Sequence, residues 1–100
     1  MDKLFVYGTL NDPDFLTSIL GRKFKVSSDR LSGYCQDFIF IDDQSFPNIY
    51  KCANGFVRGS VISGLSDIDL IKLDVYEGDR YRRISVLLDS KIKSYVYISD

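Results

Sequence analysis

Asn54 and Gly55 give the strongest local indication of how this chain folds, because both residues tolerate the positive φ of a tight β-hairpin turn. They stand between two runs rich in β-branched and aromatic residues, 49–52 and 56–62. Such runs favour strands. The sequence therefore predicts a hairpin at this dipeptide and an antiparallel sheet around it.

Further strand-like runs lie along most of the chain, at residues 3–7, 24–26, 33–41, 83–88 and 92–98. Polar residues separate several of them, notably at 42–45 and 89–91. Clusters of Asp, Ser, Asn and Gly between apolar runs are typical of turns. We expect a second hairpin at 89–91.

A first short helix is predicted directly after the first strand. Asp12 can cap it, Pro13 suits its first position, and Gly21 ends it. Its apolar face comprises Phe15, Leu16, Ile19 and Leu20.

A second helix is predicted over residues 67–76. Ser66 and Asp69 resemble a capping box, and Gly78 follows the last helical residues. Apolar side chains recur at spacings of three and four, so they share one face of the helix. That face comprises Ile68, Ile71 and Val75.

Together these elements predict the α+β class, with a mixed, strongly bent β-sheet or small β-barrel and two short flanking helices. One hundred residues suffice for one core and are too few for two. We therefore expect a single domain over residues 1–100.

The composition is that of an ordinary globular protein. Apolar residues make up 45%, charged residues 27%, and the formal net charge is −1. This balance excludes a disordered chain and gives no electrostatic indication of a nucleic-acid partner. No apolar run approaches the roughly 20 residues that span a bilayer, and no signal peptide precedes the first strand. We expect a cytoplasmic protein without a membrane partner.

The chain contains no histidine. Catalytic Ser/His/Asp and Cys/His arrangements are therefore excluded, and zinc sites lose their commonest nitrogen ligand. Acid-base chemistry would have to use a carboxylate, Lys or Tyr. Cys35 and Cys52 are interpreted as small apolar residues in a reducing compartment. We expect no metal and no cofactor.

The first candidate site is the turn formed by Tyr7, Gly8, Thr9 and Leu10, which follows the first strand. Consecutive backbone N–H groups in such a turn can bind an anion, and glycine allows a ligand to come close to the backbone. The alternative is that strand, glycine and helix simply follow one another, with Tyr7 in the core.

The second candidate is Glu77, at the end of the second helix. A carboxylate there meets the negative end of the helix dipole, so the dipole and apolar surroundings would raise its pKa. A carboxyl of this kind suits a base that takes and returns a proton near pH 7. Arg80, Arg82 and Arg83 would oppose the rise. The alternative is a surface ion pair between Glu77 and one of these arginines.

The two candidate segments together resemble two motifs of the gamma-glutamylcyclotransferase-like family, and in particular its small gamma-glutamylamine cyclotransferase-type members. The matching residues are Phe5, Val6, Tyr7, Gly8, Thr9 and Leu10 in the first motif, and Leu73, Asp74, Tyr76, Glu77, Gly78, Tyr81 and Arg82 in the second.

This resemblance implies an enzyme that cyclises the gamma-glutamyl group of a small amine or peptide to 5-oxoproline and releases the amine. Glu77 would be the catalytic acid-base. Residues Tyr7, Gly8, Thr9, Leu10 and Tyr81 would bind the small-molecule substrate. Neither a cofactor nor a nucleic-acid or membrane partner is implied.

Three alternatives remain open. The first is a non-catalytic binding or interaction domain on the same fold. The second is a related gamma-glutamyl or other acyl-group transferase of specialised metabolism that uses the same Glu77. The third is an RNA-binding β-barrel, which the slightly acidic charge disfavours. The sequence determines neither the leaving amine nor the oligomeric state.

Overall fold

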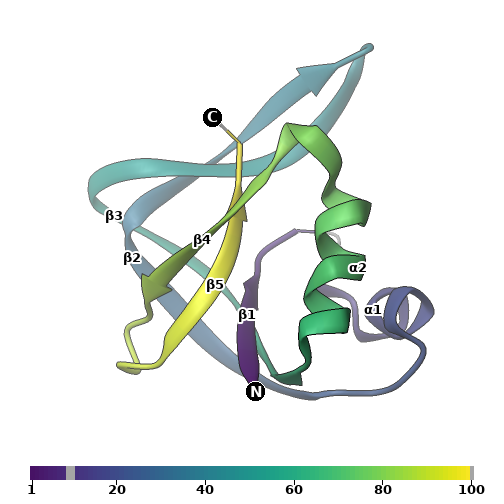
Figure 1. Ribbon diagram of the computed structural model, residues 1–100. Coiled ribbons are helices and arrows are strands. Elements are labelled where there is room, and N and C mark those ends of the chain that lie inside the picture. The colour runs from purple at the N-terminus through teal and green to yellow at the C-terminus, as the bar shows by residue number, and fades with distance from the viewer. Residues whose placement is uncertain (9–10, 100) are drawn as a thin grey trace.

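The computed structural model describes residues 1–8 and 11–99, which form one mixed β-sheet and two α-helices (Figure 1). The elements in chain order are β1 (Asp2–Val6), α1 (Pro13–Leu20), β2 (Lys25–Ile41), β3 (Gln44–Leu65), α2 (Asp67–Glu77), the 3₁₀ turn η2 (Gly78–Arg80), β4 (Arg82–Leu87) and β5 (Lys93–Ile98). The α+β class, both helices and the hairpin at 89–91 are confirmed.

The sheet has the strand order β2-β3-β1-β5-β4. β1 runs parallel to β5, and the other neighbouring strands are antiparallel. Because β2 and β4 remain separate edges in this order, the sheet is open. The bent-sheet alternative is therefore correct and the closed-barrel alternative is wrong.

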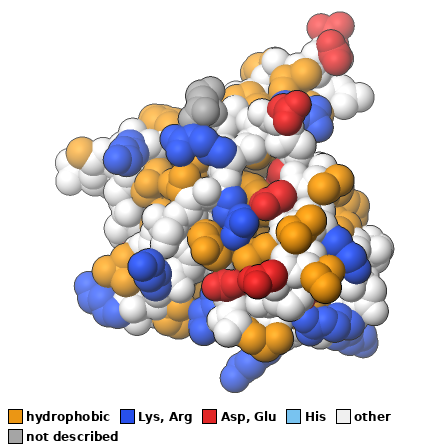
Figure 2. Space-filling view, in the orientation of Figure 1, with side chains coloured by type: hydrophobic (Ala, Val, Ile, Leu, Met, Phe, Trp, Pro, Cys, Tyr) orange, Lys and Arg blue, Asp and Glu red, His pale blue; other side chains and the backbone are white. Residues whose placement is uncertain are grey.

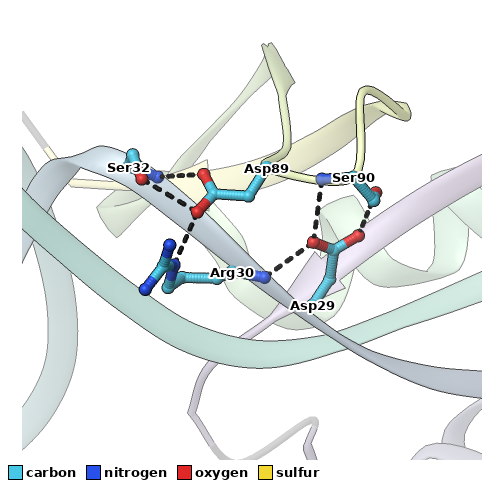
Figure 3. A network of polar contacts seen from close by, with 5 residues as sticks. All are labelled: Asp29, Arg30, Ser32, Asp89 and Ser90. Carbon is cyan, nitrogen blue, oxygen red and sulfur yellow. Dashed lines mark hydrogen bonds and ion pairs between the residues drawn. The ribbon is translucent and has the colours of Figure 1, made fainter.

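Side chains nevertheless join the two edge strands at one end (Figure 3). Asp89, in the turn after β4, accepts hydrogen bonds from the Ser32 backbone N–H at 3.1 Å and from the Arg30 Nε at 2.5 Å. Its own N–H donates to the Arg30 carbonyl at 2.9 Å. Asp29 accepts hydrogen bonds from the backbone N–H and the hydroxyl of Ser90. This network holds β2 against the β4–β5 turn without a strand ladder.

The core lies on both faces of the central strand β1, because successive side chains of a strand point to opposite faces. Leu4 and Val6 face the two helices, and Phe5 faces the opposite side. The helix side also contains Leu16, Leu20, Ile62, Leu65, Leu70, Leu73 and Tyr97. The opposite side contains Leu31, Ile49, Val57, Val61, Leu88 and Val96.

The predicted helix caps are confirmed. Asp12 accepts a hydrogen bond from the Asp14 N–H at 3.0 Å, and Gly21 ends α1 with a φ of 79°. Ser66 and Asp69 form both hydrogen bonds of a capping box at the start of α2. These local signals fix where each helix begins.

The apolar face that the spacing indicates for α2 is not the face that packs on the sheet. Ile68, Ile71 and Val75 are 66%, 60% and 76% exposed, whereas Leu70 and Leu73 are 3% and 0% exposed and belong to the core between the helices and the sheet. Figure 2 shows hydrophobic side chains gathered on the outer surface of α2. Both faces carry apolar residues at helical spacing, so the pattern alone did not identify the one that packs on the sheet.

The hairpin predicted at Asn54 and Gly55 is also wrong. β3 continues through both residues, and the chain reverses instead at Asp42 and Asp43, where β2 ends. Asn54 does adopt a positive φ of 67°, but it lies in an irregularity of the β2–β3 ladder opposite Gly33. β2 pairs with β3 on both sides of this irregularity. Asn54 belongs to a residue type that favours turns, but in this structure it lies in a bulge of the ladder.

The interpretation of the cysteines requires a correction as well. Cys35 on β2 and Cys52 on β3 form a disulfide, with their Cα atoms 5.4 Å apart and a sequence separation of 17. The long β2–β3 register brings them together, which their separation in sequence did not reveal. Gly55 makes room for this bond, because a Cβ there would collide with the Cys35 sulfur. We call residues 36–51, which the disulfide encloses, the arm.

Candidate functional site

A cavity of about 170 Å³ lies where the end of β1, the end of α2 and the arm meet. Tyr7 and Gly8 reach it from β1, Glu77 from the last turn of α2, and Tyr81 from the residue after η2. Four of the six predicted site residues therefore share one cavity. The remaining two, Thr9 and Leu10, lie outside the described residues.

Glu77 is the last residue of α2 and is half-buried in the cavity wall. The helix ends there because Gly78 adopts a φ of 69°. Burial raises the pKa of Glu77 to about 7, and the nearby Arg80 guanidinium opposes the rise. A carboxyl group with this pKa exchanges its proton readily at neutral pH.

Within the described part of the chain, Glu77 forms no ion pair, which argues against its interpretation as a surface partner of an arginine. Arg83 pairs instead with Asp74, one helical turn before Glu77, through bonds of 3.0 and 3.1 Å. Asp74 also accepts a hydrogen bond of 2.5 Å from the Tyr97 hydroxyl. Asp74 thus binds the guanidinium that could otherwise neutralise Glu77.

Two tyrosine hydroxyls brace the cavity walls. The Tyr7 hydroxyl donates to the Tyr97 carbonyl oxygen at 2.6 Å, which joins the end of β1 to β5. The Tyr81 hydroxyl donates to the Pro47 carbonyl oxygen at 2.6 Å, which joins η2 to the arm. Burial raises the pKa of both tyrosines, and the Glu77 charge adds to the rise. Both hydroxyls therefore stay protonated at neutral pH.

Gly8 permits the arm to lie against the end of β1. A Cβ at this position would stand 3.3 Å from the Cβ and Cγ of Pro47. The Gly8 carbonyl accepts a hydrogen bond from the Asn11 N–H at 2.9 Å. The anion-binding role of this turn stays a prediction, because it depends also on Thr9 and Leu10.

The sequence analysis did not assign Phe46, Arg80 or Tyr97 to the site, although all three line the cavity. The Arg80 guanidinium carbon lies 4.7 Å from the centre of the Phe46 ring. Phe46 belongs to the arm, and its position depends on how β2 and β3 bend over the sheet. Nothing in its local sequence indicates this. Arg80 could have been found from its spacing of three residues after Glu77.

Residues that could ligate a metal do not gather in the described part of the chain, where no group of three or more Cys, Asp or Glu side chains has suitable geometry. The described helices are all too short or too polar to cross a membrane. The chemistry that this cavity offers is proton transfer by one carboxyl group, beside one guanidinium and several tyrosines.

Comparison with known proteins gives a consistent result. A sequence model of the family described as "Gamma-glutamyl cyclotransferase, AIG2-like" matches residues 4–100. AIG2-like protein A of Arabidopsis thaliana is 30% identical over 106 residues, which cover 99% of this chain and 63% of that protein. The chain thus spans about three fifths of the length of this relative.

Solved structures show the same fold. A solution structure of an Arabidopsis thaliana protein superimposes with a TM-score of 0.84 at 29% identity, covering 98% of this chain and 68% of the other. A structure described as gamma-glutamyl cyclotransferase superimposes with a TM-score of 0.85 at 18% identity, covering 99% of this chain and 66% of the other. At that identity, the second likeness shows the shared fold.

Proposed function

Because this chain belongs to the gamma-glutamyl cyclotransferase, AIG2-like family, we propose that it is a cyclotransferase, with residues 1–100 acting as one domain. Its substrate would be a small gamma-glutamyl amine or peptide, and its products 5-oxoproline and the free amine. The observation that carries the proposal is the position of Glu77, a carboxyl group with a pKa of about 7 that lines one cavity with Gly8.

Glu77 serves as the general acid-base in this reaction. Its ionised form takes a proton from the substrate's α-ammonium group. The freed amine nitrogen attacks the carbon of the γ-carbonyl group and closes a five-membered ring. The bond between that carbon and the leaving nitrogen then breaks, and Glu77 returns the proton to the leaving nitrogen. The ring nitrogen loses its second proton as the lactam forms, and this proton passes to the released amine, which leaves as an ammonium ion. No oxidant, reductant or cofactor is consumed.

The intramolecular character of the attack makes these few groups sufficient. Nucleophile and electrophile belong to the same glutamyl unit, so holding it in a folded, near-attack conformation provides much of the rate enhancement. The cavity walls that would do so are fixed by the Tyr7–Tyr97 and Tyr81–Pro47 hydrogen bonds. A pKa near neutrality lets Glu77 act in both directions of proton transfer.

The turn after β1 would stabilise negative charge on the substrate. In this proposal, backbone N–H groups of Tyr7, Gly8, Thr9 and Leu10 bind the substrate's carboxylate or the oxyanion that develops on the attacked carbonyl. Tyr81 contributes the opposite wall of the same cavity. The leaving amine then points away from this turn.

The test is to incubate the protein with gamma-glutamyl dipeptides and with gamma-glutamyl-ε-lysine, and to measure 5-oxoproline by mass spectrometry. We expect wild type to form it and Glu77→Gln to be slower by about 100-fold or more, the usual contribution of a general acid-base. Asp79→Asn is the matched control, since it removes an exposed carboxylate two residues away.

Equal rates for wild type and Glu77→Gln would contradict the role of Glu77. If wild type converts none of these compounds, a non-catalytic binding domain or an acyl-group transferase on the same fold becomes the better explanation. Binding of a gamma-glutamyl compound without turnover would favour the non-catalytic binding domain. Transfer of its acyl group to another acceptor would favour the acyl-group transferase.

A further inference from the structure

Arg80 is a cationic group of the cavity that the proposed chemistry does not use. Among residues 1–8 and 11–99, the charged side chains that line this cavity are Glu77 and Arg80. Glu77 has a role, because it meets the α-ammonium group of the substrate. A guanidinium beside it has no part in moving that proton and lowers the pKa of the base. Its presence calls for a different explanation.

The surroundings of Arg80 leave its hydrogen-bond donors available. Its guanidinium lies over the ring of Phe46, with 4.7 Å between the guanidinium carbon and the ring centre. Contact with an aromatic ring engages the face of a guanidinium and not the N–H groups in its plane. No ion pair involving Arg80 occurs in the described part of the chain, whereas Arg83 is paired with Asp74. Arg80 therefore rests against Phe46, and its guanidinium has no ion-pair partner among the described residues.

The position of Arg80 indicates which part of the substrate it would meet. The glutamyl unit must lie with its amine at Glu77 and its γ-carbonyl near Gly8, in the half-buried part of the cavity. Arg80 is exposed, so it stands where the cavity opens to solvent. The group that projects from the γ-carbonyl towards the opening is the leaving amine.

We propose that Arg80 determines specificity by binding a carboxylate on the leaving amine, so that gamma-glutamyl amino acids are preferred to gamma-glutamyl amines that lack this carboxylate. A planar guanidinium binds a carboxylate through two parallel hydrogen bonds, which a neutral amine substituent cannot replace. The inference rests on the proposed cyclotransferase function and adds to it the chemical class of the leaving group.

Two compounds that differ only in this group provide the test. Gamma-glutamyl-alanine and gamma-glutamyl-ethylamide have the same amide and the same methyl group, but only the first has a carboxylate on the leaving side. For wild type we expect kcat/KM to favour the alanine compound by about 10- to 100-fold, the range for a charge-assisted hydrogen-bonded pair. In Arg80→Ala this preference should vanish, because kcat/KM for the alanine compound should fall about 10- to 100-fold further than kcat/KM for the ethylamide.

Two controls make the comparison specific. The two compounds are compared at the same pH with each enzyme, so that any effect of Arg80 on the pKa of Glu77 changes both rates alike. Lys72→Gln removes one positive charge from an exposed position on α2 and should retain the wild-type preference. A preference that persists in Arg80→Ala overturns the inference. So does an equal loss for both compounds, because Arg80 would then bind the carboxylate of the glutamyl unit.

Binding measurements separate failure of this inference from failure of the proposed function. The affinities of both compounds are measured by calorimetry with Glu77→Gln and with the double variant Glu77→Gln/Arg80→Ala. The inference is supported if Glu77→Gln binds the alanine compound more tightly than the ethylamide and the double variant does not. This holds even if wild type turns over neither compound. Equal affinities for the two compounds overturn it, even if wild type converts both to 5-oxoproline.

Discussion

Replacing Glu77 with Gln is expected to change the pH dependence of stability as well as activity. Burial raises the pKa of the Glu77 carboxyl group from an ordinary value of 4.5 to about 7. The folded state therefore holds this proton more tightly than the unfolded state. The stability that this proton contributes is fully present below pH 4.5 and is lost as the pH rises through 7. Gln has no proton to lose, so the variant should not show this decline.

The size of the effect follows from the pKa. A rise from 4.5 to about 7 corresponds to about 3 kcal/mol at 1.36 kcal/mol per pKa unit, which is an upper bound. Glu77 is only half-buried, and water at the cavity opening screens its charge. We therefore expect Glu77→Gln to be more stable than wild type by about 1–2 kcal/mol at pH 8.5, which raises Tm by roughly 5–10 °C in a chain of this size.

The measurement is urea unfolding of wild type and Glu77→Gln at several pH values between 4 and 9. The stability difference should grow through the interval from pH 5 to 8 and then level off. Asp79→Asn, an exposed neighbour outside the cavity, serves as the control and should show no such growth. A difference between Glu77→Gln and wild type that is the same at pH 5 and pH 8.5 would refute the burial of an ionisable Glu77 carboxyl.

Three further predictions concern the walls of the cavity. The double variant Cys35→Ser/Cys52→Ser should lose about 3 kcal/mol of unfolding free energy, the value for a loop of this length, as measured by urea unfolding without reductant. Tyr81→Phe removes the hydrogen bond to the Pro47 carbonyl and should cost about 1 kcal/mol in the same assay, with a higher KM. Gly8→Ala places a Cβ 3.3 Å from Pro47, and we expect KM to rise while urea unfolding shows a loss of about 1 kcal/mol or less.

The sequence predicted local structure well where the determining contacts are local. The caps of both helices are hydrogen bonds between residues two or three apart, and both were predicted from Asp12, Ser66 and Asp69. The hairpin at Asn54 and Gly55 failed for the opposite reason. The turn propensity of Asn54 was real, but the pairing of β2 with β3 continues past it and absorbs the positive φ as a bulge.

Tertiary contacts determine which face of α2 is buried and that the two cysteines pair, and neither could be predicted from the sequence pattern. α2 has apolar residues on two faces, and packing in the core between the helices and the sheet determines that Leu70 and Leu73 are buried. Cys35 and Cys52 gave no local sign of pairing, because only the register of two long strands places them side by side. Neither result can be read from residue spacing within one element.

In the candidate site, too, some residues could be predicted from local sequence and others only from tertiary contacts. Two short motifs predicted Tyr7, Gly8, Glu77 and Tyr81, and the structure places all four in one cavity, close to the ends of β1, α2 and η2. Phe46 was not found, since it reaches the cavity only through the arm.

The arm is tied to the rest of the protein by a small number of specific bonds. The disulfide fixes its base, the Tyr81 hydroxyl binds the Pro47 carbonyl, and Asn48 accepts a hydrogen bond of 2.8 Å from the Ser99 N–H. Because the arm carries Phe46, against which Arg80 rests, loosening it would disturb the position of Arg80 more than that of Glu77. Under the proposed function, Glu77 at the end of α2 would transfer the proton and the turn after β1 would bind the anionic group. If Arg80 binds the leaving group as proposed, the arm would influence that specificity through Phe46, on which Arg80 rests, and no local motif encodes the position of the arm.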